Sequence, residues 1–251
     1  MERKRQKPRR KASQEDHFEA AALDLEARQQ PRPKKNIKAF RPATDRQADY
    51  ADAIDFSTYT FGTGPAGTGK TYVAAIKACQ HLRSSDKTKV ILTRPAVEAA
   101  GEKLGFLPGE LPEKFGPYMK PLMRIMIDQL GASFVDTLIK YERLQMIPLA
   151  FMRGETFEDA LIIADEMQNA TREQMKMLLT RIGEGSRMII DGDPAQTDIG
   201  EDSGLEDAIY RLRNIKNVSV VRFEKSDIVR HTIIQEVITA YEREPARAIQ
   251  V

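Results

Sequence analysis

A glycine-rich stretch at residues 61–71 carries residue types that bind phosphate. Within it, Gly64-x-x-x-x-Gly69-Lys70-Thr71 has the spacing of a P-loop. Glycines let the backbone turn tightly and approach a phosphate closely, so that its N–H groups surround the anion. The Lys70 ammonium can reach the β- and γ-phosphates of a nucleotide, and the Thr71 hydroxyl can bind Mg²⁺. The stretch predicts an ATP and Mg²⁺ site with nucleotide-binding residues Gly64, Pro65, Ala66, Gly67, Thr68, Gly69, Lys70 and Thr71.

The sequence on either side of the loop supports this interpretation. Residues 57–61 are mostly β-branched or aromatic, which predicts a strand. Residues 72–79 have apolar side chains at helical spacing, and the start of such a helix favours a bound anion. A glycine loop that arose by chance would not need a strand before it and a helix after it.

Two carboxylates follow a second candidate strand. Residues 160–164 form a continuous apolar run, typical of a central strand in a parallel sheet, and Asp165 and Glu166 come directly after it. Ligands of open α/β sheets bind at the carboxyl ends of the strands. There Asp165 can hold Mg²⁺ opposite Thr71, Glu166 can activate an attacking water, and Gln168 can reach the γ-phosphate or that water. The alternative is an acidic surface turn.

Two further glutamines are candidates for nucleotide contacts. Gln196 belongs to Gly192-Asp193-x-x-Gln196, directly after the apolar run 187–190, and its amide could bind the γ-phosphate and sense its loss. Gly-Asp-Pro is also an ordinary turn sequence. Gln47 precedes the P-loop, and its amide offers both a donor and an acceptor to the edge of an adenine. Its alternative is an exposed polar residue on a helix.

Composition fits a soluble globular protein. The 251 residues are 41% hydrophobic and 30% charged. There is no apolar run long enough to cross a bilayer and no apolar core of a signal peptide, so we expect a cytoplasmic protein that does not bind membranes. A single cysteine, Cys79, excludes an internal disulfide, and its place on an apolar helix face predicts a small core residue.

Residues 1–42 are expected to form a basic tail, and residues 43–251 the folded domain. Seven of the first eleven residues are Lys or Arg, and a second basic stretch is broken by prolines at residues 31–35. Such a segment buries too little apolar surface to offset the entropy of ordering, although residues 13–30 could form a helix. The tail could contact nucleic-acid phosphates or could be a solvated leader, and both interpretations stay open.

Strands and helices are expected to alternate along the domain. This order predicts one α/β domain, with a mostly parallel sheet that helices cover on both faces. The stretch 101–109 is rich in glycine and proline and predicts a functional loop. The expected strands are 57–61, 88–93, an edge strand at 146–151, 160–164, 187–190 and 218–223, and the expected helices are 44–54, 72–79, 117–130, 171–182, 203–212 and 228–241.

Several stretches resemble known families. The P-loop, Asp165-Glu166-Met167-Gln168 and Gly192-Asp193-Pro194-Ala195-Gln196 are similar to the first-domain motifs of superfamily 1 helicases. A closer resemblance, covering about residues 43–241, is to the PhoH family of phosphate-starvation-inducible ATP-binding proteins, which has many virus-encoded members. It is carried by Thr93-Arg94-Pro95-Ala96-Val97-Glu98, Gly101-Glu102-Lys103-Leu104-Gly105-Phe106-Leu107-Pro108-Gly109, Met152-Arg153-Gly154, Glu173-Gln174-Met175-Lys176-Met177 and Ser226-Asp227-Ile228-Val229-Arg230-His231.

The PhoH resemblance implies a RecA-like P-loop ATPase core and roles for further residues. Lys70, Thr71, Asp165 and Glu166 would lie at the phosphates, and Gln47 becomes a plausible adenine contact. Arg230 is implied as an arginine finger. The segment Thr93, Arg94 and Pro95 is implied to face nucleic acid or a neighbouring subunit. Met167 and Pro194-Ala195 depart from the family's pattern without removing a catalytic group.

The partners follow from the same resemblance. A monomeric helicase needs two RecA-like domains, and only about twenty residues follow Arg230. We therefore expect a homo-oligomer, such as a head-to-tail hexameric ring, that acts on RNA or single-stranded DNA. The alternative is a nucleotide-dependent switch with slow hydrolysis and a protein partner. A small-molecule kinase is disfavoured, because it needs a substrate hydroxyl site rather than these acid and glutamine motifs.

Overall fold

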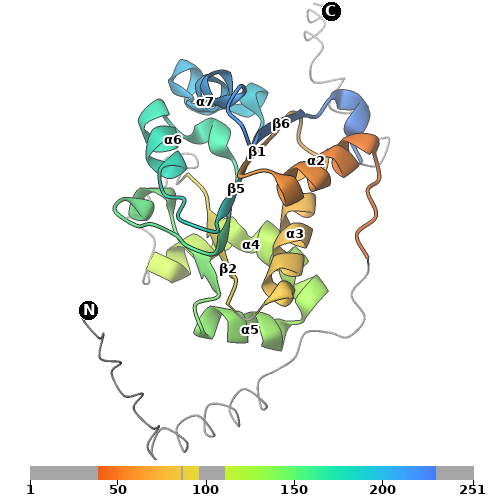
Figure 1. Ribbon diagram of the computed structural model, residues 1–251, viewed down its shortest axis with the longest axis vertical. Coiled ribbons are helices and arrows are strands. Elements are labelled where there is room, and N and C mark those ends of the chain that lie inside the picture. The colour runs from red at the N-terminus through yellow and green to blue at the C-terminus, as the bar shows by residue number, and fades with distance from the viewer. Residues whose placement is uncertain (1–38, 86, 96–110, 230–251) are drawn as a thin grey trace, which may run out of the picture.

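The computed structural model describes residues 39–85, 87–95 and 111–229 (Figure 1). These residues form a six-stranded sheet in the order β3-β2-β4-β5-β1-β6, and every strand pair is parallel. The predicted α/β fold with a parallel sheet is therefore confirmed. The strands are β1 (Tyr59–Thr63), β2 (Lys89–Thr93), β3 (Leu144–Met146), β4 (Ala160–Ala164), β5 (Arg187–Gly192) and β6 (Val218–Arg222).

Helices cover both faces of this sheet, as the sequence predicts (Figure 1). Successive strand residues point to opposite faces, so Val90, Leu92 and Leu161 pack with one group of helices, and Ile91 and Ile162 with the other. The first group comprises α2 (Asp45–Phe56), α3 (Lys70–Ser84), α4 (Leu111–Leu130) and α5 (Ala132–Lys140). The second comprises α6 (Arg172–Leu179) and α7 (Leu205–Leu212). Among the described residues, every helix is too short or too polar to span a lipid bilayer.

The structure corrects three details of the predicted elements. The edge strand β3 ends at Met146, and residues 149–152 form a 3-10 turn, because Pro148 has no N–H to continue a strand. Helix α4 begins at Leu111, before the predicted start at residue 117. Helix α5, after Gly131, was not predicted at all.

Some expected elements lie outside the described residues. These are the basic tail with its candidate helix, the loop 101–109, and the helix expected at 228–241 apart from its first two positions.

The strand order brings the candidate chemistry to one edge of the sheet. Strand β1 lies between β5 and β6, and β5 lies beside β4. Because all of these strands run in the same direction, the segments after β1, β4 and β5 leave the same edge. Those segments are the P-loop, Asp165-Glu166 and Asp193.

A buried polar contact joins α2 to β5 across β1. Tyr50 Oη donates a hydrogen bond to Asp191 Oδ1, and the side chains of both residues are almost fully buried. Gly62 of β1 lies between them: a Cβ on Gly62 would lie 2.8 Å from Tyr50 Oη and closer still to Asp191 Oδ1. The glycine is therefore needed for space.

The second oxygen of this carboxyl, Asp191 Oδ2, is buried without a hydrogen-bond partner among the described residues. Burial raises the pKa of Asp191 to about 8, and the neighbouring Asp165 adds to the rise, while the Tyr50 hydrogen bond and Lys70 oppose it. Burial at this position therefore favours the protonated form of the Asp191 carboxyl.

The first prediction is that Gly62→Ala destabilises the fold. The added methyl group must displace Tyr50 or Asp191 in a packed interior, which should lower the free energy of unfolding by about 1–3 kcal/mol. Chemical denaturation measures this change. Gly116→Ala in α4 is the matched control, because a Cβ there meets no atom within 4 Å and alanine favours the helix. Equal stability of Gly62→Ala and wild type would show that Gly62 is not closely packed.

The second prediction concerns pH. The unfolded chain loses the Asp191 proton near pH 4, whereas the folded protein keeps it until about pH 8. Stability of the wild type should therefore fall between these pH values, by up to about 1.4 kcal/mol per pH unit from this group. Asp191→Asn cannot ionise and escapes this loss, so its melting temperature should rise relative to wild type as pH increases from 5 to 8. The exposed Asp52→Asn is the control, and a pH-independent difference between wild type and Asp191→Asn would contradict the assignment.

Candidate functional site

The P-loop lies between the end of β1 at Thr63 and the start of α3 at Lys70. Gly64, Gly67 and Gly69 have φ values of 127°, 87° and 88°, which only glycine adopts without strain. Neighbouring segments hold the loop in place through its backbone. Gly64 N–H donates to Gly192 O at 3.3 Å, and Gly67 O accepts from Val229 N–H at 2.9 Å.

Lys70 is folded into this loop. Its Nζ donates to Gly64 O at 2.6 Å and to Pro65 O at 2.9 Å. Burial lowers the pKa of Lys70, while the nearby Asp191 and Asp193 carboxyls oppose that shift. In this structure the loop's own carbonyl oxygens therefore bind the ammonium and hold it beside the P-loop backbone.

The predicted metal ligands meet across the sheet edge. Thr71 Oγ1 donates to Asp165 Oδ1 at 3.3 Å, although the two residues are far apart in the sequence. Burial raises the pKa of Asp165, and the Arg94 charge opposes the rise. Among the described residues, no group of three or more His, Cys, Asp or Glu side chains is arranged so that it could hold a metal ion. The donor set fits Mg²⁺ held by one carboxylate and one hydroxyl, with phosphate and water oxygens completing its shell.

Both carboxylate oxygens of Glu166 are held by side chains. Arg94 Nη2 lies 2.7 Å from Glu166 Oε1, and Gln168 Nε2 donates to Glu166 Oε2 at 2.6 Å. The Glu166 backbone is left-handed, with φ 57° and ψ 37°, an uncommon conformation for a residue with a Cβ. Such strain persists where the surrounding contacts fix it. The structure therefore fixes the direction in which Glu166 points.

The hydrogen bonds continue from Gln168 to the segment after β5. Gln168 Oε1 accepts from Asp193 N–H at 3.1 Å, and Gln196 Nε2 donates to Asp193 Oδ2 at 2.7 Å. Asp193 also caps the short 3-10 turn Pro194–Gln196 by accepting from Ala195 N–H at 3.1 Å. Pro194 and Ala195 therefore fit a capped turn that presents Gln196 at the surface.

A cavity of about 340 Å³ joins these groups. This volume lies at the lower end of the range for small-molecule sites. Residues of the P-loop, of the start of α3, of α4, of the end of β5 and of the segments that follow β2, β4 and β5 line it. They are Ala66, Gly67, Gly69, Lys70, Thr71, Tyr72, Arg94, Pro121, Ile125, Asp165, Glu166, Gly192, Asp193 and Gln196.

Gln47 does not have the surroundings of an adenine contact. Its side chain is buried, Nε2 donates to Thr68 O at 2.9 Å, and Oε1 accepts from Ala43 N–H at 2.9 Å. Both ends of the amide are thus used by the protein's own backbone, so neither is directed at an adenine edge. In the described geometry, Gln47 instead connects α2 to the P-loop through these hydrogen bonds.

The segment implied to face nucleic acid is mostly interior. Thr93 and Pro95 are buried, and Thr93 Oγ1 has no hydrogen-bond partner among the described residues. These two side chains are therefore not available to a ligand in this structure, and contact of the segment with nucleic acid or a neighbouring subunit stays a prediction. Arg94 is partly exposed and remains a candidate. Arg230 lies outside the described residues.

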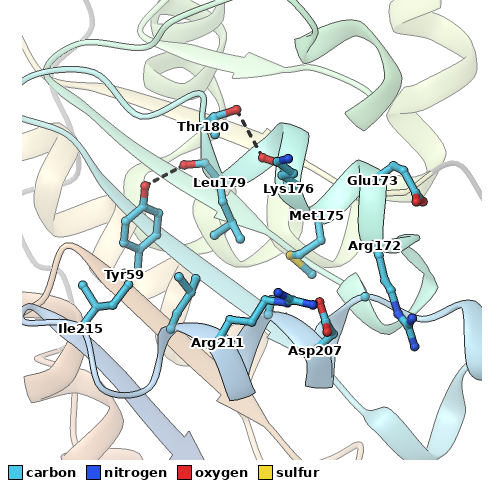
Figure 2. A pocket seen from close by; sticks show the side chains of 13 residues that line it. Tyr59, Arg172, Glu173, Met175, Lys176, Leu179, Thr180, Asp207, Arg211 and Ile215 are labelled. Atoms are coloured by element: carbon cyan, nitrogen blue, oxygen red, sulfur yellow. Dashed lines mark hydrogen bonds and ion pairs between the residues drawn. The ribbon is translucent and has the colours of Figure 1, made fainter.

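A second, larger cavity of about 740 Å³ lies between α6 and α7 (Figure 2). Tyr59 is at the start of β1 and donates to Leu179 O at 2.7 Å, so this cavity is at the end of β1 opposite the P-loop. None of the predicted site residues lines it. The larger cavity is therefore not where the phosphate-binding groups converge.

Sequence reasoning missed the structural roles of several residues that contact or position the candidate site residues. Asp191 follows an apolar run, as Asp165 does, but it points into the interior at Tyr50 and not into the cavity. Tyr50 is indistinguishable in the sequence from an ordinary core residue of α2. Asp193 was recognised only as part of a motif, whereas its carboxylate positions Gln196. The one available signal was the alternation of side chains along a strand, because neighbouring residues at the end of β5 point to opposite faces of the sheet.

Comparison with known proteins supports the resemblance noted in the sequence. A family model described as PhoH-like protein matches residues 39–242. A PhoH-like protein of Mycobacterium tuberculosis (strain ATCC 25618 / H37Rv) is 47% identical over 208 residues, 82% of this chain and 59% of that protein. The PhoH-like protein of Bacillus subtilis (strain 168) is 47% identical over 209 residues, 82% of this chain and 65% of that protein.

Protein PhoH of Escherichia coli (strain K12) is 44% identical over 201 residues, 78% of this chain and 56% of that protein. The chain therefore spans less than two thirds of the length of these relatives. Among solved structures, the UvsW helicase from bacteriophage T4 aligns with 10% identity and a TM-score of 0.43, over 85% of this chain and 69% of that one. Since the family model covers most of the sequence and several relatives exceed 40% identity, the chain belongs to the PhoH-like protein family.

Proposed function

We propose that this protein is a Mg²⁺-dependent ATPase. The observation that carries the proposal is the 3.3 Å contact between Thr71 Oγ1 and Asp165 Oδ1 at the mouth of the P-loop. A hydroxyl and a carboxylate in this arrangement are the protein ligands of Mg²⁺ in nucleotide hydrolases with a P-loop. Membership of the PhoH-like family supports the same type of site.

Each group has a role in hydrolysis. The P-loop N–H groups and Lys70 bind and neutralise the β- and γ-phosphates, and Mg²⁺ supplies further positive charge when it is bound. Glu166 lies next to the metal carboxylate and would orient the attacking water and accept its proton. Gln196 would contact the γ-phosphate, held in position by Asp193.

We propose further that the active form is a homo-oligomer, a hexameric ring being one arrangement. Among the described residues that line the cavity, the cationic side chains are Lys70 and Arg94, and Arg94 is paired with Glu166. Transfer of a phosphoryl group benefits from an additional arginine at the γ-phosphate. Arg230 of a neighbouring protomer is the proposed source.

The proposed substrate partner is RNA or single-stranded DNA. Two features support it: the density of Lys and Arg at the start of the chain, and a partly exposed arginine, Arg94, beside the catalytic carboxylate. Binding of phosphate groups near Arg94 would connect the nucleic acid directly to the site of hydrolysis.

A nucleotide-dependent switch with a protein partner is the second candidate. It is favoured by the two contacts that hold both oxygens of Glu166, because a restrained base would hydrolyse ATP slowly. The two candidates differ in their response to RNA: the switch would show slow turnover that RNA does not accelerate, together with nucleotide-dependent binding of a protein.

The third prediction is that Glu166→Gln separates hydrolysis from binding. The amide keeps the size of the side chain but cannot accept the proton from water, so kcat should fall by about 10²–10⁴-fold. ATP affinity should change little. Phosphate release measures the rate, and titration with a fluorescent ATP analogue measures affinity. Glu184→Gln, an exposed residue at the other end of β5, is the control. Wild-type turnover in Glu166→Gln would exclude Glu166 as the base.

The fourth prediction is that Lys70→Ala weakens ATP binding. The ammonium makes charge-assisted hydrogen bonds to phosphate that are worth about 1.5–3 kcal/mol each, so affinity should fall by about 10- to 100-fold. Titration with Mg²⁺ and the fluorescent analogue measures the loss. Lys77→Ala in the same helix, whose Nζ pairs with Asp55 at 2.5 Å, is the matched control. Retained affinity in Lys70→Ala would exclude the P-loop as the phosphate site.

A further inference from the structure

The contacts of Glu166 occupy one lone-pair site on each of its carboxylate oxygens and hold the carboxylate in one orientation. Arg94 holds one carboxylate oxygen and Gln168 the other, so the protein and not a water molecule sets the direction of the carboxylate. A general base must direct a free lone pair at the proton that it removes. In this arrangement Glu166 is present but restrained.

The Arg94 guanidinium contacts two groups at once, the Glu166 carboxylate and a backbone carbonyl of α4. Its Nη2 pairs with Glu166 at 2.7 Å, and its Nη1 donates to Tyr118 O of α4 at 2.9 Å. Thr93 and Ala164, the residues at the ends of β2 and β4, are register partners in the sheet. Arg94 and Glu166 follow these strand ends, so the pairing of β2 with β4 brings the two side chains together.

The ion pair is open to exchange with a ligand. The side chains of Arg94 and Glu166 are 21% and 40% exposed. Ion pairs that solvent can reach are weak, because water and competing ions replace their attraction. The planar guanidinium is also the group that binds phosphate oxygens in pairs. A phosphate that approaches this side of the site can therefore take Arg94 from Glu166.

We propose that Arg94 is a positioning residue that restrains Glu166 until a phosphate of single-stranded nucleic acid binds the Arg94 guanidinium and releases the carboxylate. ATP hydrolysis then depends on the polynucleotide. The inference rests on the proposed ATPase function and adds to it the means by which nucleic acid controls the rate. Gln168 extends the effect, because its other end accepts from Asp193 N–H, next to the turn that carries Gln196.

The test compares ATP turnover of three variants with that of the wild type. Arg94→Gln removes the guanidinium, and Arg94→Lys keeps the charge but cannot make both contacts. Arg213→Gln is the matched control, because Arg213 is an exposed arginine that follows α7 and stacks on Tyr210, 4.7 Å from the ring centre. Each full-length protein is assayed with Mg²⁺ and ATP, with and without oligouridylate or oligothymidylate. Melting temperatures establish that the variants are folded.

The expected result is a change in oligonucleotide dependence. Arg94→Gln should turn over ATP without oligonucleotide about fivefold faster than the wild type, roughly the factor that a partly exposed ion pair contributes. Its rate should respond no further to oligonucleotide, and its KM for ATP should stay near the wild-type value. Arg94→Lys should be intermediate, and Arg213→Gln should behave as the wild type does.

Other outcomes overturn the proposal. A fall in kcat of Arg94→Gln under both conditions would show that Arg94 acts directly at the phosphates. Full stimulation of Arg94→Gln by oligonucleotide would show that nucleic acid acts elsewhere. If ATP turnover of the wild type rises only with protein concentration, a second protomer, and not nucleic acid, releases Glu166 from Arg94. If the wild type binds MgATP but never hydrolyses it, and Arg94→Gln does not either, the ATPase function itself fails.

Discussion

Parallel pairing of β4, β5 and β1 is the constraint on which the candidate site depends. Neighbouring strands in a parallel sheet end at the same edge, so the segments that follow them are brought together regardless of their separation in the sequence. The contact between Thr71 and Asp165 is a direct result. An antiparallel strand at either position would carry its carboxylates to the opposite edge. The chemistry of the site thus depends on backbone direction before any side chain is considered.

Helix α2 supports this edge from outside the recognised motifs. Gln47 and Tyr50 are three residues apart and therefore lie on the same side of the helix. Gln47 bonds to the P-loop at Thr68 O, and Tyr50 to the end of β5 at Asp191. One helical turn thus fixes the spacing between the P-loop and the strand that leads to Gln196. These contacts are buried, where a lost hydrogen-bond partner is costly.

The sequence was most informative where structure follows from local pattern. The P-loop, the apolar strand before Asp165 and the alternation of strands and helices each depend on a few neighbouring residues, and their fold prediction is confirmed. It was least informative where a side chain's role depends on distant partners. From the sequence, Gln47 was expected to contact adenine or to be an exposed polar residue, and its buried hydrogen bonds to Thr68 and Ala43 depend on the fold. Helix α5 was missed because it is short and follows α4 after a single glycine.

The hydrogen bond from Val229 N–H to Gly67 O gives the loop a mechanical connection to the rest of the chain. Gly67 belongs to the P-loop, whose backbone would contact the phosphates of a nucleotide under the proposed function. A shift of this carbonyl either breaks the bond or pulls the segment after β6 along with it. The segment after β6 is therefore coupled mechanically to the P-loop through this hydrogen bond. If the loop binds a nucleotide as proposed, this hydrogen bond transmits a movement of the loop along the backbone itself, without a relay of side chains.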